Sequence, residues 1–262
     1  MDLENIGFGV GAAKTGSHSL AGLFASAIKV AHEPDSERFL ALVLQFERGE
    51  LSGAELQRSV KALLIAQGAQ LNVAAMNGYL IRTVFSAFPS ARYILTVRDA
   101  GSWVRSFVNH QVTRSPAPTS GWHAFRELRF VRDCRPHRPE ELPLLQRGIY
   151  SLDAYLGYWA KHNLTVIETI PGPQLCIVAT HHLARDAKRL SRFIGVRPGA
   201  VALERSHQFK GDYRKPSPLD DISPKYLAER VAAYTRTLLE LSARTLGDEH
   251  INILREALAY PS

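Results

Sequence analysis

Hydrophobic positions along the chain alternate between short runs typical of buried strands and longer segments with helical spacing. Strands are predicted at 6–10, 27–31, 91–97 and 174–178, and the third is the richest in β-branched and aromatic side chains. Helices are predicted at 19–24, 36–48, 53–66, 77–88, 102–110, 148–169, 185–195 and 224–246. Because strands alternate with helices, we expect an α/β fold with a parallel central sheet flanked by helices. Ligands of such sheets bind beyond the carboxyl ends of the strands.

The stretch 111–147 departs from this alternation. It contains Pro116, Pro118, Pro136, Pro139 and Pro143, together with arginines at positions 126, 129, 132, 135 and 138. We interpret it as an insertion or lid within a single domain spanning 1–262. The arginine series is either a solvated helix face or a cationic rim for an anionic substrate.

Composition narrows the class of protein. With 262 residues, of which 45% are hydrophobic and 22% charged, the chain can bury a large core and is not of disordered type. Its two cysteines exclude a disulfide scaffold and a four-thiolate metal site. No apolar run reaches the ~20 residues of a membrane helix, and the N-terminus lacks the pattern of a signal peptide. We therefore expect a cytoplasmic protein without integral membrane contact.

The formal charge of +7 favours an anionic partner, and the segment 8–20 suggests where it binds. There an apolar run, a turn of small residues and a helix follow one another, which directs backbone N–H groups at one point. A Walker loop needs Lys and Ser/Thr directly after its second glycine, but Ser17 and His18 stand there and Lys14 precedes Gly16. A dinucleotide fingerprint through Gly7 and Gly9 lacks a full preceding strand and a suitable acidic residue.

Two motifs resemble those of sulfotransferases that use 3′-phosphoadenosine 5′-phosphosulfate (PAPS). The run Lys14-Thr15-Gly16-Ser17-His18-Ser19 is similar to their 5′-phosphosulfate loop. Arg98 at the end of the strongest predicted strand, with Ser106 eight residues later, is similar to their 3′-phosphate anchor. A guanidinium offers phosphate a bidentate fork, and the serine adds a hydroxyl donor. Lys210-Gly211 resembles the segment that closes over the 3′-phosphate in this family.

The resemblance implies a P-loop nucleotide-kinase-like sulfotransferase fold and a cofactor site built from the residues of these motifs. PAPS would be the donor, adenosine 3′,5′-bisphosphate the product, and no metal would be required. Lys14 would stabilise the leaving phosphate during an in-line transfer. The general base would be Glu33, which matches the glutamate of bacterial-type and tyrosylprotein branches, or otherwise His18 or His32.

The acceptor would be a hydroxyl or amine of a small molecule, glycan or lipid. Segments 35–75 and 110–147 are the expected acceptor loops, in which Phe39, Phe46, Trp122, Phe125 and Phe130 either line an apolar pocket or pack in the core. The alternatives to a sulfotransferase are an ATP-dependent kinase of related fold and a non-catalytic nucleotide-binding protein. No nucleic-acid-binding motif is visible, and His181, His182 and His207 lack the further ligands of a metal set.

Overall fold

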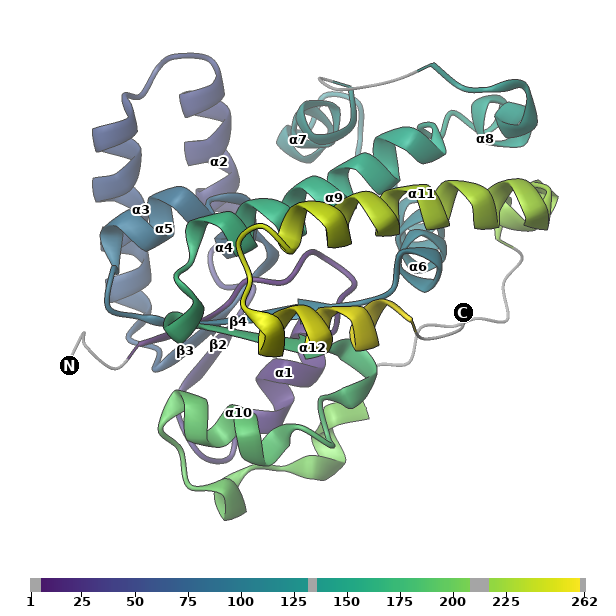
Figure 1. Ribbon diagram of the computed structural model, residues 1–262. Coiled ribbons are helices and arrows are strands. Elements are labelled where there is room, and N and C mark those ends of the chain that lie inside the picture. The colour runs from purple at the N-terminus through teal and green to yellow at the C-terminus, as the bar shows by residue number, and fades with distance from the viewer. Residues whose placement is uncertain (1–5, 132–135, 208–216, 260–262) are drawn as a thin grey trace.

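A parallel sheet of five strands forms the centre of the computed structural model, which describes residues 6–131, 136–207 and 217–259 (Figure 1). The strands are β1 (Gly7–Gly9), β2 (Val30–His32), β3 (Leu71–Val73), β4 (Arg92–Val97) and β5 (Leu175–Ala179). Their order is β2-β3-β1-β4-β5, and every pairing is parallel. All five carboxyl ends therefore lie at one edge of the sheet, with β1 in the middle.

Twelve α-helices connect and cover these strands within the described residues. They are α1 (Ser17–Phe24), α2 (Ser36–Glu47), α3 (Gly53–Gln67), α4 (Ala75–Tyr79), α5 (Ile81–Ala87), α6 (Ala100–Thr113), α7 (Gly121–Phe130), α8 (Leu142–Gln146), α9 (Leu152–Thr169), α10 (Ala187–Ile194), α11 (Pro224–Ser242) and α12 (Asp248–Leu258). In the described part of the chain, no helix is long and apolar enough to cross a membrane.

The sheet separates two hydrophobic cores of unequal size. Alternation along β4 sends Leu95 and Val97 into the larger core and Ile94 into the smaller one. Helices α2 to α9 and α11 lie on the larger side, whereas α1 and α10 cover the opposite face (Figure 1). Because both faces of β4 are covered, its sequence is almost continuously apolar.

The expected fold class, an α/β fold with a parallel central sheet flanked by helices, is confirmed, with differences in single elements. The periodicity does not predict β3, because Asn72 interrupts its short apolar run. Asn72 is nevertheless buried, and its side-chain oxygen accepts a hydrogen bond from Asn77 Nδ2 at 2.8 Å. The helix expected over 77–88 is divided at Leu80 into α4 and α5. Helices α7, α8 and α12 are further elements that the periodicity does not predict.

Candidate active site

The loop between β1 and α1 has the conformation of an anion-binding turn. Lys14 and Gly16 both have left-handed backbone angles, with φ of 72° and 91°. This conformation is costly for a residue with a Cβ, so the surroundings of Lys14 must hold it in place. A Cβ at Gly16 would also lie 2.9 Å from Cγ2 of Thr180, so glycine serves both the backbone and the packing there.

Buried threonines fix this loop against the sheet. The Thr15 hydroxyl donates to the carbonyl of Ala12 at 2.7 Å and lies 2.9 Å from the hydroxyl of Thr96 on β4. From the end of β5, the Thr180 hydroxyl donates to the Thr15 carbonyl at 2.7 Å. The side chain of Thr15 thus faces the interior and anchors the loop, which leaves its neighbours Lys14 and Ser17 to face a ligand.

Helix α1 offers its N-terminus at the end of the loop. Gly16 occupies the position before its first residue, and within the described structure no side chain caps the helix and no acidic residue lies in its first turn. The first N–H groups of such a helix lack intrahelical partners and, with the helix dipole, attract anions. Ser17, His18 and Ser19 form that first turn, directly after Lys14 and Gly16 of the loop, so their backbone N–H groups lie at the end of the helix that attracts anions.

Lys14 and Arg98, which are far apart in the sequence, lie together at this loop. The Arg98 guanidinium donates through Nη1 to the Lys14 carbonyl at 3.4 Å and through Nε to the Ser102 hydroxyl at 2.9 Å. Burial lowers the pKa of Lys14, and the positive charges of Arg114 and Arg98 lower it further. Three cations therefore gather around one end of α1, which favours a ligand with more than one negative charge.

Helix α6 positions Arg98 and places further polar side chains near it. Asp99 begins the helix by accepting a hydrogen bond from the Ser102 N–H at 2.8 Å. Ser106, the serine that the sequence pairs with Arg98, lies one turn beyond Ser102 and is half-buried. The contact of Ser102 with Arg98 is therefore a feature that the motif comparison missed.

His110, one turn beyond Ser106, is a second site residue that sequence reasoning missed. Burial lowers its pKa to about 4, and the charges of Lys14, Arg114, Arg126 and Arg129 add to this effect. His110 is thus a neutral imidazole at neutral pH that experiences the field of Lys14 on one side and of the α7 arginines on the other. The four-residue spacing of Ser102, Ser106 and His110 is the signal that would have indicated it.

Two histidines lie beside the loop on the β2 side. The rings of His18 and His32 have centroids 3.9 Å apart, and His32 Nε2 lies 3.2 Å from the Ser17 hydroxyl. Burial, followed by the charge of His18, lowers the pKa of His32 to about 4. The pKa of the more exposed His18 is lowered by burial and by Lys14. These contacts bring the end of β2 against the first turn of α1.

Glu33 directly follows His32 and is held in a defined position. Its backbone is left-handed, with φ of 45°, and its N–H donates to the Val73 carbonyl at 2.9 Å. One carboxylate oxygen accepts a hydrogen bond from the Ala75 N–H at 3.0 Å. Burial raises the pKa of Glu33, and the bond from Ala75 opposes that rise. A partly desolvated carboxylate at the carboxyl edge of the sheet is suited to accept a proton.

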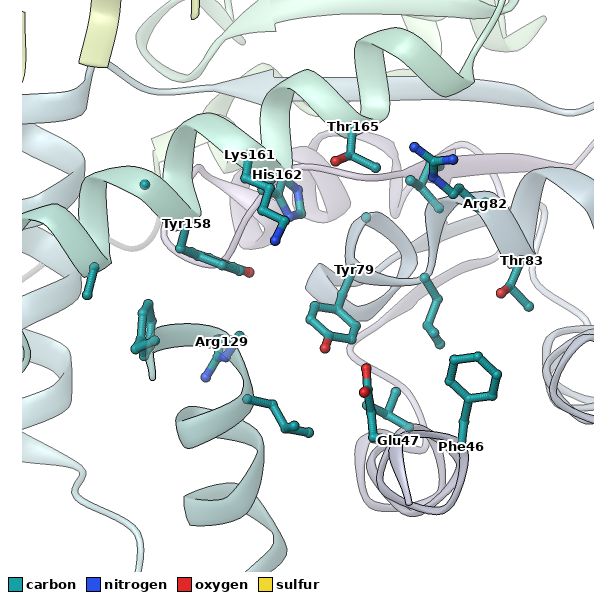
Figure 2. Close-up of a pocket in the computed structure, with 18 of the residues that line it drawn as sticks. Phe46, Glu47, Tyr79, Arg82, Thr83, Arg129, Tyr158, Lys161, His162 and Thr165 are labelled. Atoms are coloured by element: carbon teal, nitrogen blue, oxygen red, sulfur yellow. The ribbon is translucent and has the colours of Figure 1, made fainter. Parts of the chain in front are cut away.

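A cavity of about 630 Å³ lies next to the loop, among helices α2, α3, α4, α5, α7, α9 and α11 (Figure 2). Two of its wall residues, Gly78 and His162, contact the backbone that leads into the loop. His162 Nε2 donates to the Val10 carbonyl at 2.9 Å, and a Cβ at Gly78 would lie 2.2 Å from the same oxygen. Tyr158, also in the wall, packs against Trp103, whose indole N–H donates to the Ala13 carbonyl at 2.9 Å.

Some of the predicted acceptor aromatics line this cavity, and others do not. Phe46 and Phe130 belong to its wall, whereas Phe39 and Phe125 are buried in core packing. Trp122 donates to Glu37 on α2 and thereby links α7 to that helix. The segments 35–75 and 110–147 therefore both contribute to the cavity, through α2, α3 and α7.

Two further expectations concern residues away from the loop. Lys210 and Gly211 lie outside the described residues. His181 and His182 follow β5, and His182 lies 3.8 Å from Glu256 of α12. Among the side chains that the structure describes, no group of three or more His, Cys, Asp or Glu residues has the arrangement of a metal site.

Comparison with known proteins identifies similar domains. Residues 8–207 match the sulfotransferase domain family. The crystal structure of a sulfotransferase from Alicyclobacillus acidocaldarius is 16% identical with a TM-score of 0.52, over 94% of this chain and 98% of that one. The sulfotransferase domain of the Synechococcus PCC 7002 olefin synthase is 16% identical with a TM-score of 0.42, over 98% and 95% of the two chains. No curated protein sequence matches this chain significantly.

Proposed function

The chain belongs to the sulfotransferase domain family, and we propose that it transfers a sulfuryl group from PAPS to a hydroxyl or amine of an acceptor. The observation that supports this donor most strongly is the meeting of Lys14 and Arg98 at one loop. A doubly phosphorylated nucleotide needs cations at two places. The resemblance of the two motifs assigns Lys14 to the 5′-phosphosulfate and Arg98 to the 3′-phosphate. We propose in addition that a single domain spans residues 1–262 and that it belongs to the bacterial-type branch, in which a glutamate is the base.

The residues present fit an anionic nucleotide. The uncapped N-terminus of α1 and the ammonium of Lys14 would hold the 5′-phosphosulfate, with Gly16, Ser17, His18 and Ser19 around it. Thr15 would contribute by fixing the loop, since its hydroxyl is bonded to the interior. Arg98 and Ser106, joined by Lys210 and Gly211, would bind the 3′-phosphate. When bound, PAPS supplies the sulfuryl group to be transferred.

Lys14 would stabilise charge on the leaving phosphate. Sulfuryl transfer resembles phosphoryl transfer, in which positioning and charge stabilisation account for most of the catalysis. A partly buried ammonium, held by a strained backbone, is preorganised and interacts more strongly with developing charge than an ammonium in water does. The backbone strain at Lys14 is therefore consistent with a catalytic position.

Glu33 would remove the proton from the acceptor. Its raised pKa makes it a stronger base than an exposed glutamate, and the Ala75 N–H fixes one of its oxygens so that the other can take the proton. His32 and His18 are the alternatives, because both lie at the loop and the neutral form of each can accept a proton. The segment 111–147, with α7 in its middle, would form one side of the acceptor site.

Ligand-induced thermal stabilisation tests the choice of donor. Adenosine 3′,5′-bisphosphate should raise the melting temperature of the protein, whereas ATP with magnesium and single-stranded oligonucleotides should have little effect. Stronger stabilisation by ATP with magnesium would favour the kinase alternative. Stabilisation by the bisphosphate without transfer from PAPS to any acceptor in a broad panel would favour the non-catalytic alternative.

Two variants separate binding from catalysis. Lys14→Ala should reduce turnover by ~10²–10³-fold and largely retain affinity for adenosine 3′,5′-bisphosphate, because the lysine acts mainly on the charge that develops on the leaving phosphate in the transition state. Arg98→Ala should weaken bisphosphate binding by about 2–5 kcal/mol, the scale expected for a lost buried charge-assisted contact. Arg58→Ala, an exposed charge change on α3, is the matched control and should alter neither quantity. Radiolabelled donor and calorimetric titration provide the two measurements.

A further inference from the structure

The cavity beside the loop contains a cation in unusual surroundings. The guanidinium of Arg129 lies 4.3 Å from the ring centroid of Phe125, 5.2 Å from that of Phe130, 5.5 Å from that of Tyr158 and 5.9 Å from that of Phe107. Cation–π contacts of this kind compensate part of the cost of removing a charge from water. They do not satisfy its N–H groups. Within the described residues, the Nε of Arg129 is buried and has no hydrogen-bond partner.

The cavity carries a second cation on the facing helix. Lys161 and Tyr158 extend from α9 into the space that Arg129 borders from α7 (Figure 2). Asp153, an acidic residue of the wall, forms ion pairs with Arg230 and with Arg138. On the other side, the Glu47 carboxylate points toward the Tyr79 hydroxyl (Figure 2). The α7–α9 side of the cavity therefore carries two cations, and the exposed Arg82 of α5 is a third cation in the wall.

Much of the remaining wall is apolar, and the cavity is large enough for an organic molecule. Val43, Phe46, Leu56, Leu80, Ile81 and Leu128 line it. A volume of about 630 Å³ lies within the range of pockets that enclose small ligands. A largely apolar cavity with cations in its wall has the pattern of a site for an amphipathic anion, because the body of the ligand covers the apolar side chains and its anionic group pairs with the cations.

The cavity also lies close to the loop between β1 and α1, which would bind the donor. Gly78 and His162 of its wall touch the Val10 carbonyl, four residues before Lys14. His110 experiences the charge of Lys14 and of Arg129 alike. The wall of the cavity is therefore in contact with the backbone that leads into the loop, as an acceptor site requires.

From these contacts we propose that the cavity is the acceptor site, and that the acceptor is an apolar alcohol or phenol with an anionic group bound by Arg129 and Lys161. This proposal rests on the proposed sulfotransferase function and specifies its substrate class. The hydroxyl oxygen of the acceptor attacks the sulfur, its proton passes to the base, and the bond from sulfur to the leaving phosphate oxygen breaks. Arg129 is a specificity-determining residue in this scheme, since it selects the anion and takes no part in the transfer.

Calorimetric titration with a matched pair of probes tests this proposal. The probes are 4′-hydroxybiphenyl-4-carboxylate and its neutral carboxamide, added to protein with and without saturating adenosine 3′,5′-bisphosphate. The carboxylate should bind roughly tenfold more tightly or better, since it alone offers a charged acceptor to the guanidinium. Arg129→Met should reduce the preference to within about twofold, whereas Arg129→Lys should retain part of it. Lys161→Met should also lower the preference for the carboxylate. This variant serves as the second test if Arg129→Met does not fold.

Arg236→Met is the control, because it removes one positive charge from an exposed position on α11 outside the cavity. It should leave the preference for the carboxylate unchanged. Equal affinity of both probes, absence of binding, or an unchanged preference in folded Arg129→Met would overturn the proposed substrate class. Such a result with normal bisphosphate binding would leave the sulfotransferase proposal intact. Conversely, absence of bisphosphate binding with a retained carboxylate preference would contradict only the proposed donor.

Discussion

At the scale of single residues, Glu33 illustrates how function and stability oppose one another. Burial raises its pKa, so that folding favours the protonated carboxyl, yet the proposed base must be ionised to accept a proton. The folded state binds more protons than the unfolded state between the ordinary and the raised pKa. The contribution of Glu33 to stability is therefore complete below its ordinary pKa and is lost as pH rises through the raised value.

Glu33→Gln should consequently raise the melting temperature near neutral pH while it lowers turnover. The amide oxygen still accepts the hydrogen bond from the Ala75 N–H, but the variant carries no buried charge and cannot accept the proton. We expect a loss in turnover of about 10²–10⁴-fold with unchanged affinity for adenosine 3′,5′-bisphosphate. Unchanged turnover would transfer the base role to His32 or His18, whose Asn variants would then be the ones to lose activity.

Single residues also show which features of the site could not be predicted from the sequence. The positions of Lys14 and Arg98 followed from motif spacing, because the carboxyl ends of parallel strands share one edge. The contact of Arg98 with Ser102, and the inward orientation of Thr15, depend on side-chain rotamers that the motif does not specify. His110 lies on a helix in a position that no motif marks, and the arginine series that contains Arg129 could be interpreted equally well as a solvated helix face. Only the fold places Arg129 in the wall of the cavity.

At the scale of elements, the turn between β1 and α1 is the most constrained segment of the site. Gly16 combines a left-handed backbone with a close approach to Thr180 after β5. Strands that are distant in the sequence thus determine the shape of the turn. The same dependence on neighbouring strands explains why β3 was not predicted from the sequence. Its three residues, with a central asparagine, form a strand only because β1 and β2 pair with it on either side.

Gly16→Ala should therefore disturb both folding and binding. A Cβ costs about 1–2 kcal/mol in a left-handed conformation, and the contact with Thr180 adds to that cost. We expect a lower unfolding free energy by denaturant titration and a weaker affinity for adenosine 3′,5′-bisphosphate. Gly49→Ala is the matched control, because its φ is 74° but nothing lies within 4 Å of an added Cβ. It should show a comparable backbone penalty with normal binding, and a binding defect of equal size there would contradict the role of the loop.

At the scale of the whole molecule, the large layer of helices both covers the sheet and forms the cavity proposed for the acceptor. The alternation of elements predicted the parallel sheet with helices on both faces, since patterning reports which faces are buried. It could not predict the cavity, whose wall combines α2, α3, α4, α5, α7, α9 and α11. Such a wall depends on packing between elements that local periodicity does not describe. His162 connects the helical layer to the sheet, because it lines the cavity and donates to the carbonyl of Val10, the residue directly after β1.

His162 should make the fold sensitive to acid. Burial lowers its pKa from 6.5 to about 4, opposed by the bond to Val10 and reinforced by the charge of Arg129. Between these values the unfolded state binds a proton that the folded state does not, so stability falls as pH decreases from 6.5 toward 4. His162→Gln retains an N–H donor and takes up no proton. The difference in unfolding free energy between the two proteins should therefore change by ~1.4 kcal/mol per pH unit in this range. His32 and His110 titrate in both proteins, so their contributions cancel in the difference in unfolding free energy. If urea titrations give a difference that does not depend on pH, His162 is not the titrating group.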